Sequence, residues 1–464
     1  MKKRSESLDA LRGFAILAMV MSSSIAFGIL PAWMYHAQVP PPAHSFNPNL
    51  PGITWVDLVF PFFLFSMGAA LPLSLTKKTR EASPLQVIWF ILQRGILLAF
   101  FSIFTMHIRA YINYDAGMGK WLLAIGAFIL IHLMFVKWPD YMSTKVALTL
   151  KVAAFACAIF ILTQLTFKDG SGFKLTRIDI IIMVLANMAV FGSAAWVLTK
   201  GNMWARVLIL PFIMGIFLSG AVADSWTQKV FNWTPLPGIY SFYYLKYLFI
   251  IIPGTIAGEW LQHFMKQSGE PKNLPAGVSY FLAFLSFALI VINLAGLFER
   301  VLVANLITSL VIVLTSIIAA KKITKETGDV IYEKFVKAGS YLLLLGLVFE
   351  AYQGGIKKDS STYSYYFVTS GLAFYFLCGL LLLERMNKLT APIRYLAANG
   401  KNPMVAYVAG NLIVLPILHI TGGDKLMHMM DNNVWTGFLE GVIFTGIVSL
   451  ITVLFVRLKF FWKT

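Results

Sequence analysis

The sequence predicts an all-α polytopic membrane protein, and three observations lead to this fold class. The 464-residue chain is 58% hydrophobic and 13% charged, whereas soluble domains carry about 25% charged residues. Its apolar residues fall in repeated runs of roughly 17 to 25, the length that crosses a hydrocarbon core as a helix. These runs lack the strict alternation over about ten positions that marks a membrane β-barrel strand. We therefore expect a single domain, residues 1–464, with about 12 to 14 transmembrane helices.

The expected spans follow these apolar runs in order. The start, MKKRSES and then an apolar run, resembles a signal peptide, but the run has no small-residue cleavage site and is expected to stay as the first helix. Asn402 precedes Pro403 and predicts a helix N-cap near the last spans. The spans are expected near 13–31, 53–75, 86–108, 121–136, 146–166, 178–198, 207–224, 240–264, 276–297, 304–320, 338–353, 363–384, 402–419 and 436–456.

The distribution of basic residues predicts the topology. With the N-terminus in the cytoplasm, inside loops would hold about 24 Lys and Arg residues and outside loops about 10, an asymmetry that favours N-in and C-in. The net charge of +17 is thus a topological signal and does not indicate a nucleic-acid partner. The two cysteines, Cys157 and Cys378, fall inside expected spans, so the sequence indicates neither a disulfide framework nor a metal site.

The loop at 32–52 and the span behind it hold the first candidates for chemistry. The loop contains His36 and His44 but no Lys or Arg, and its prolines at 40–42, 48 and 51 stiffen the backbone. Histidine can accept a proton near neutral pH or carry an acyl group briefly. Asp57 opens the following span and would either orient a histidine or interact with the positive helix N-terminus.

Several other polar residues lie within or beside expected spans. Asp9, Arg12 and Arg94 are ionisable groups in apolar surroundings, where charges are expensive and mark functional sites by default. Arg94 lies near the middle of its span, where it would pair with a carboxylate or bind a phosphate. We expect Arg12, Asp9 and Arg94 to contribute to substrate binding.

Four segments together resemble a known family. SLDALRGFAILAMV, the histidine loop, TWVDLVFPFFLFSMG and the late GKNPMVAYV are similar to the transmembrane acyltransferases typified by heparan-α-glucosaminide N-acetyltransferase, in particular a bacterial branch linked to N-acetylglucosamine utilisation. In that family a loop histidine before the Asp helix mediates acyl transfer. By position His44 matches it, with His36 as its rival, and Asp57 would orient the histidine. Ser23 stands where the family has an Asn, and Asn402 lies in the matching late segment.

The resemblance implies an enzyme of the bacterial inner membrane. It would take an acetyl group from cytoplasmic acetyl-CoA, a co-substrate, and pass it to an amino sugar or glycan on the periplasmic side, without a metal. Its partners would be membrane lipid and the acceptor, and a homodimer is among the assemblies left open. The alternative from another class is an amino-sugar transporter or permease of the N-acetylglucosamine type, because many spans and intramembrane charges fit both.

Overall fold

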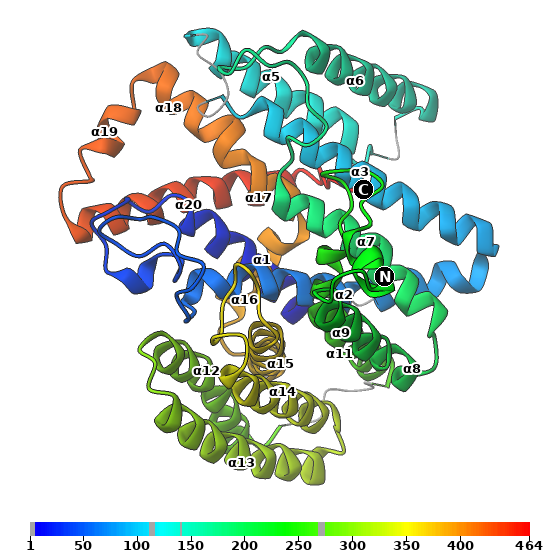
Figure 1. Cartoon of the computed structure of the whole chain (residues 1–464), viewed down its shortest axis with the longest axis vertical. Coiled ribbons are helices and arrows are strands. Elements are labelled where there is room, and N and C mark those ends of the chain that lie inside the picture. Colours follow the sequence, from blue (N-terminus) through cyan, green and yellow to red (C-terminus); the bar gives the residue numbers. More distant parts are fainter. Residues whose placement is uncertain (1–4, 111–116, 140–141, 268–273) are drawn as a thin grey trace. The chain divides into compact units, whose positions relative to one another are not determined.

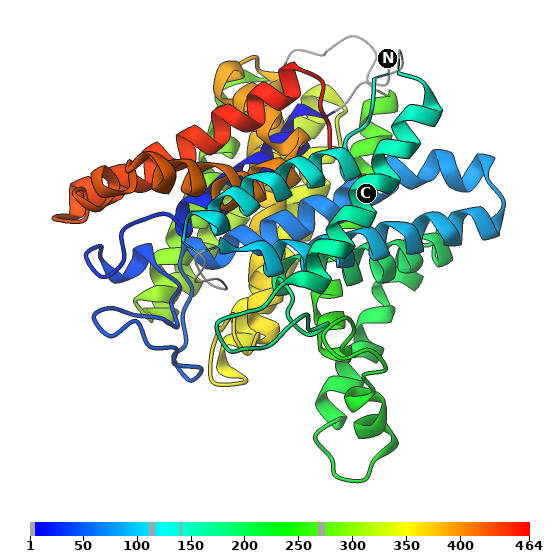
Figure 2. The same ribbon diagram turned by 90° about the horizontal axis from the view of Figure 1, so that it is seen from above.

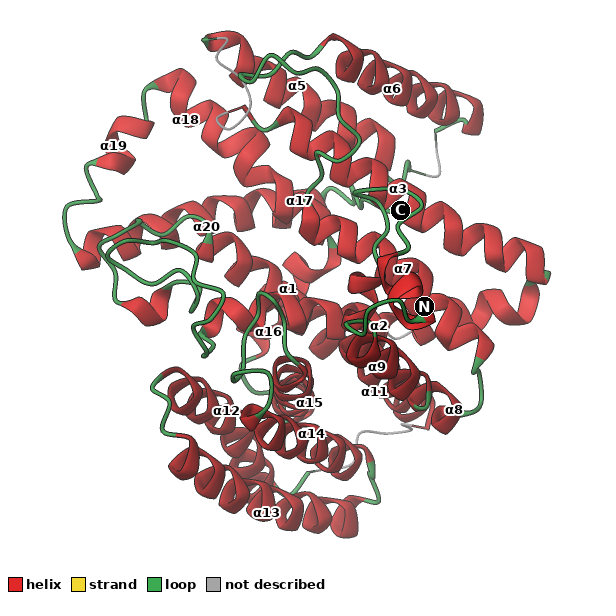
Figure 3. Ribbon diagram, in the orientation of Figure 1, coloured by secondary structure: helices red, strands yellow, loops and turns green. Residues whose placement is uncertain are grey.

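The computed structural model describes residues 5–110, 117–139, 142–267 and 274–464, which form a multi-pass, all-α membrane protein (Figure 1). Within these ranges the only strand-like pairing is an isolated bridge between Val136 and Trp462, and every other regular element is helical (Figure 3). The predicted fold class is confirmed.

Nine helical stretches in the described ranges are long and apolar enough to cross a membrane, and each coincides with an expected span. Two further expected spans, 121–136 and 207–224, correspond to the shorter apolar helices Gly119–Phe135 and Met203–Ser219. The nine are α2 (Trp55–Glu81), α3 (Pro84–Ile108), α6 (Thr144–Gln164), α7 (Ile180–Leu198), α12 (Ala276–Phe298), α13 (Leu302–Thr327), α15 (Tyr363–Arg385), Pro403–Thr421 and α20 (Val434–Arg457).

The remaining three expected spans have different bounds in the structure. The first helix, α1, covers Glu6–Ser22 rather than 13–31, because Ser5 caps its start and the run Ser22, Ser23 and Ser24 turns its hydroxyls back onto helix carbonyls at its end. The span expected at 240–264 is a 3₁₀ turn, Phe242–Tyr247, followed by α11 (Leu248–Gln267). The span expected at 338–353 is α14 (Ile331–Val348) and the 3₁₀ turn Phe349–Ala351.

The helices group into two compact units. The first unit contains residues 1–77 and 249–400, and the second contains residues 78–248 and 401–464. Each unit joins segments that are distant in the sequence, so no linker composition marks the boundaries.

The first unit is built around α15, which packs against α14, α12 and α1. Nearly all residues in the apolar part of α15 are buried, so α15 is a central helix of this unit. Helices α2 and α11 approach each other through glycines: a Cβ on Gly254 would lie 2.4 Å from the carbonyl oxygen of Phe65, and one on Gly258 would lie 2.1 Å from that of Ala69. Such contact between backbones requires small residues. The unit also holds α16 (Thr390–Lys401).

The second unit pairs α3 with α7, α5 (Met118–Phe135) with α6, and α17 (Pro403–Ala409) with α20. Between α17 and α18 (Leu415–Thr421) the chain forms a π-helical segment, Gly410–Val414. The short helices α8 (Met203–Val207), α9 (Ile209–Ser219) and α10 (Trp226–Asn232) follow α7, and α9 and α10 lie side by side as the green hairpin of Figure 2. The last is α19 (Asp424–His428).

Candidate functional site

The candidate site is centred on Asp57, in the first turn of α2. Its side chain is fully buried, and one carboxylate oxygen, Oδ2, accepts hydrogen bonds from the backbone nitrogens of Ala37 (3.2 Å) and Thr54 (3.0 Å) and from the Thr54 hydroxyl (3.3 Å). A helix N-terminus stabilises a nearby negative charge. The Tyr365 hydroxyl of α15 donates to the backbone oxygen of Asp57 at 2.8 Å. These contacts fix the carboxylate and leave its second oxygen, Oδ1, for another partner.

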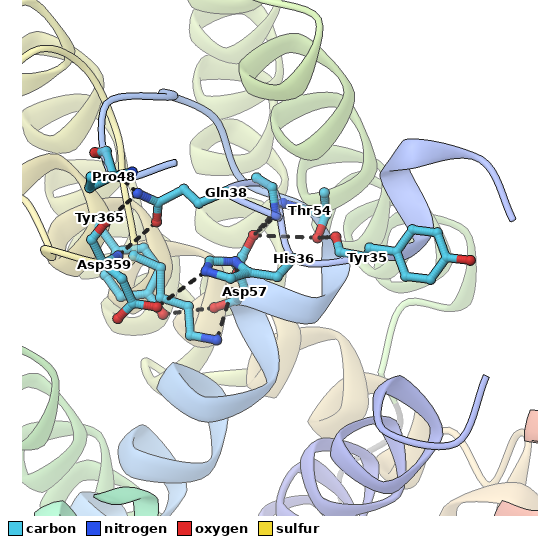
Figure 4. A network of polar contacts seen from close by, with 10 residues as sticks. Tyr35, His36, Gln38, Pro48, Thr54, Asp57, Asp359 and Tyr365 are labelled. Atoms are coloured by element: carbon cyan, nitrogen blue, oxygen red, sulfur yellow. Dashed lines mark hydrogen bonds and ion pairs between the residues drawn. The ribbon is translucent and has the colours of Figure 1, made fainter. Parts of the chain in front are cut away.

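That partner is His36, which lies between two carboxylates (Figure 4). Its Nδ1 is 2.5 Å from Asp57 Oδ1, and its Nε2 is 3.2 Å from Asp359 Oδ2. Lys358 places its ammonium nitrogen 3.7 Å from Asp57 Oδ1. The four side chains therefore form a charge cluster, which we call the His36 cluster. It is closed on the Asp57 side, whereas the Asp359 side chain is 51% exposed; Nε2 itself is buried against Asp359, so a ligand would reach this nitrogen after Asp359 moves.

Two loops far apart in the sequence assemble the cluster. Gln38 links them, because its Oε1 accepts from the Asp359 backbone nitrogen at 2.8 Å and its Nε2 donates to the backbone oxygens of Asp359 and, at 3.3 Å, Pro48. A second link joins the backbone nitrogen of Gly52 to the Ile356 carbonyl at 2.8 Å. The loop before α2 is thereby attached to the loop before α15.

The surroundings of His36 raise its pKa above the usual 6.5. Burial is the largest influence and lowers the pKa, but the contacts with Asp359 and Asp57 together outweigh it, while the positive charge of Lys358 opposes them weakly. A raised pKa makes the neutral imidazole a stronger base than a free histidine. An imidazole whose Nδ1 is held by a buried carboxylate and whose Nε2 is covered only by the half-exposed Asp359 side chain has the arrangement of a general base with its orienting group.

His44 does not join this cluster, so the prediction that Asp57 orients His44 is wrong. The His44 backbone has a positive φ of 46° and follows a turn in which its nitrogen bonds to the Pro40 carbonyl. Its ring packs against Phe27, at 4.0 Å between centroids, and Tyr35, at 4.8 Å. Neither ring nitrogen has a hydrogen-bond partner among the described residues. The rival histidine, His36, is the one that contacts Asp57.

A family model described as a domain of unknown function, DUF5009, matches residues 4–261, more than half of the chain. The chain belongs to the DUF5009 family. No curated protein matches it. The DUF5009 segment contains His36, Asp57 and Gln38, whereas Lys358, Asp359 and Tyr365 lie beyond its end.

Two further predicted residues of the DUF5009 segment, Asp9 and Arg12, lie together in α1. Arg12 Nη1 is 3.5 Å from Asp9 Oδ1 and 3.4 Å from the Gly400 carbonyl, and Nη2 is 3.2 Å from that of Ser66. Both terminal nitrogens of Arg12 thus contact protein oxygens, and they connect α1 to α16 and α2. Ser23 lies at the C-terminal end of α1, where its hydroxyl donates to the Val20 carbonyl at 2.8 Å.

The last two predicted residues, Arg94 and Asn402, belong to the second unit. Arg94 is half-buried in α3. Asn402 occupies the N-cap position of α17, as predicted, but its side chain makes no capping bond. The buried amide instead donates to the Phe460 carbonyl at 2.8 Å and accepts from the Trp462 nitrogen at 3.1 Å, which fastens the C-terminal segment.

Sequence reasoning missed Gln38, Thr54, Lys358 and Asp359. The polar stretch QGGIKKDSST directly before the span at 363–384 could have pointed to the last two. Glycines and charged residues beside a membrane helix are found in ordered functional loops as well as in simple connectors. In the described part of the chain no three His, Cys, Asp or Glu side chains are grouped as metal ligands.

Proposed function

We propose that this DUF5009 protein is an acyltransferase of the bacterial inner membrane. It would move an acetyl group from cytoplasmic acetyl-CoA to an amino sugar or glycan on the periplasmic side. The supporting observation is the His36–Asp57 pair, with 2.5 Å between Nδ1 and Oδ1, in which the histidine comes from the loop directly before α2. That is where the resembling family has its reactive histidine. The N-in and C-in topology belongs to the same proposal, since it would put this loop opposite the CoA pool.

The chemistry assigned to His36 is proton acceptance. The acceptor amine attacks the thioester carbonyl, a C–N bond forms, the C–S bond breaks, and CoA leaves as a thiolate, which becomes the thiol by receiving the proton that His36 has taken from the amine. Neutral His36 takes the amine proton at Nε2, and Asp57 stabilises the resulting imidazolium through Nδ1. The same nitrogen, Nε2, would be the atom acylated if the acetyl group passed through a transient acyl-imidazole. In both routes Asp359 has to leave Nε2, which its exposure permits.

The test uses purified protein, labelled acetyl-CoA and glucosamine. We expect transfer by the wild type and a loss of about 10²- to 10⁴-fold in His36→Ala, the range that a general base contributes. His44→Ala is the matched control, because its ring packs against aromatic rings in the same loop and does not contact Asp57. Absence of transfer to any amino sugar, or full activity in His36→Ala, would contradict the proposal.

The transporter alternative is an outcome of a parallel assay. Uptake of labelled N-acetylglucosamine into proteoliposomes without an acyl donor would favour it over acyl transfer. Acetyl-CoA provides the complementary measurement, because a ligand that binds the folded state raises the thermal midpoint. An acyltransferase is stabilised by acetyl-CoA in a concentration-dependent way, and a sugar permease has no binding site that would produce this effect.

A further inference from the structure

An ion pair outside the His36 cluster lies behind the loop that carries Lys358 and Asp359. Arg300, in the turn between α12 and α13, contacts Glu350 Oε1, and the Glu350 side chain is only 4% exposed. Taking the Glu350 carboxylate out of water costs several kcal/mol, and Arg300, which is 32% exposed, offsets only part of this cost, so the pair is weak evidence for added stability. The position of this pair therefore calls for another explanation.

The second oxygen of Glu350 fixes the backbone of that loop. Oε2 accepts from the Ile356 nitrogen at 2.6 Å and from the Ser364 hydroxyl at 3.3 Å. Gly355 allows this close approach: its φ is +91°, and a Cβ there would lie 2.9 Å from Glu350 Oε1 and 2.7 Å from the Pro51 Cβ. Only glycine has this backbone conformation at no steric cost.

Ile356 passes this constraint to the candidate site in two directions. Its carbonyl accepts from the Gly52 nitrogen at 2.8 Å, which holds the loop before α2. Two and three residues later, Lys358 and Asp359 contact Asp57 and His36. A chain of direct contacts thus leads from Arg300 to the imidazole, entirely within the first unit.

We propose that the Arg300–Glu350 pair is a positioning device that holds the Lys358–Asp359 loop against His36. Glu350 is a positioning residue, since its carboxylate oxygens contact Arg300, the Ile356 nitrogen and the Ser364 hydroxyl rather than the imidazole or its two carboxylate partners. The charged groups that face His36 are Asp57, Asp359 and Lys358, and Glu350 acts on the last two through Ile356. Only the catalytic consequence of this device rests on the proposed acetyl transfer.

The experiment measures the pKa of His36 by NMR on histidine-labelled full-length protein, with the resonance assigned from His36→Gln. We expect Glu350→Ala to change this pKa, and Asp359→Asn to lower it because a carboxylate is lost. If Glu350 acts through Asp359, then Glu350→Ala produces no further change in the Asp359→Asn background. Glu350→Gln keeps an acceptor for the Ile356 nitrogen and is expected to restore most of the wild-type value.

Glu333→Ala is the matched control, since Glu333 pairs with Lys337 within α14, away from the 3₁₀ turn that carries Glu350. Arg300→Lys replaces Glu350→Ala if the latter does not fold, because lysine keeps the positive charge but lacks the planar guanidinium. We expect Arg300→Lys to shift the pKa of His36 in the same direction as Glu350→Ala, by a smaller amount. A wild-type His36 pKa in Glu350→Ala and Arg300→Lys, with lowered thermal midpoints, would reduce the pair to a structural role. The measurement needs no acyl donor, so lack of acetyl transfer with an intact coupling refutes the proposed function alone.

Discussion

Replacing Asp57 should separate its structural role from its effect on His36. In Asp57→Ala the backbone nitrogens of Ala37 and Thr54 lose their acceptor in a buried place. A buried donor without a partner costs about 1–3 kcal/mol, so the two together predict a loss of about 2–6 kcal/mol. In Asp57→Asn an amide oxygen can still accept both bonds, and the loss should be about 1 kcal/mol per bond, the difference between a charge-assisted and a neutral hydrogen bond.

The assay is thermal unfolding in detergent, combined with the His36 pKa and acetyl transfer. Asp179→Ala is the control, because Asp179 is also a buried carboxylate at the N-terminus of a helix. It accepts hydrogen bonds from the backbone nitrogens of Ile181 and Ile182 at the start of α7, in the second unit. Both alanine variants should unfold at lower temperature, but only Asp57 variants should lower the pKa of His36. An Asp57→Ala protein as stable as Asp57→Asn would refute the assigned hydrogen bonds, and an unchanged His36 pKa in both would refute the pair.

Three further predictions concern pH and packing. His36 acts as a base when it is neutral, and its pKa is raised, so the rate of acetyl transfer should increase as pH rises through that pKa, above 6.5. Asp359→Asn should shift this increase in rate to lower pH, because the carboxylate that raises the pKa is lost. By the same shift His36 contributes stability that is complete below about pH 6.5 and is lost as pH rises through the raised folded-state pKa, so His36→Gln should flatten the thermal midpoint across this window. Gly13→Ala should destabilise the first unit by about 1–3 kcal/mol or more in thermal unfolding, because its Cβ would lie 1.8 Å from the Leu396 carbonyl oxygen, and a midpoint within error of the wild type would contradict this packing.

Most of the membrane helices could be predicted from the sequence, because the hydropathy of a segment is determined by the residues within that segment. Each of the nine long apolar helices was expected, whereas α1 and α11 begin and end at other residues than hydropathy indicates. Ser22, Ser23 and Ser24 end α1 early by bonding to its last carbonyls. The two units could not be predicted, since the chain passes between them inside helices or short connections.

Only those parts of the candidate site that lie close together in the sequence were predicted. Asp57 and a loop histidine were identified because they lie within about twenty residues of each other and beside a span. Choosing between His36 and His44 depended on the turn after Pro40, which directs the His44 ring toward Phe27 and Tyr35. Lys358 and Asp359 come from a loop more than 300 residues away, and no local pattern indicates a contact over that separation.

The charge balance of the His36 cluster explains why a second carboxylate suits a base at this position. Counted by formal charge, Asp57 and Asp359 carry two negative charges and Lys358 one positive charge, so the cluster is at −1 with His36 neutral and at zero with His36 protonated. An amine acceptor has to lose a proton as it becomes an amide. A cluster that is neutral after taking this proton stabilises the product of the step more than its starting state, because an uncompensated charge is expensive beside the fully buried Asp57. Lys358→Met would leave two carboxylates against one imidazolium, so the pKa of His36 should rise. The pH range in which the rate of acetyl transfer increases should then shift upward by the same amount.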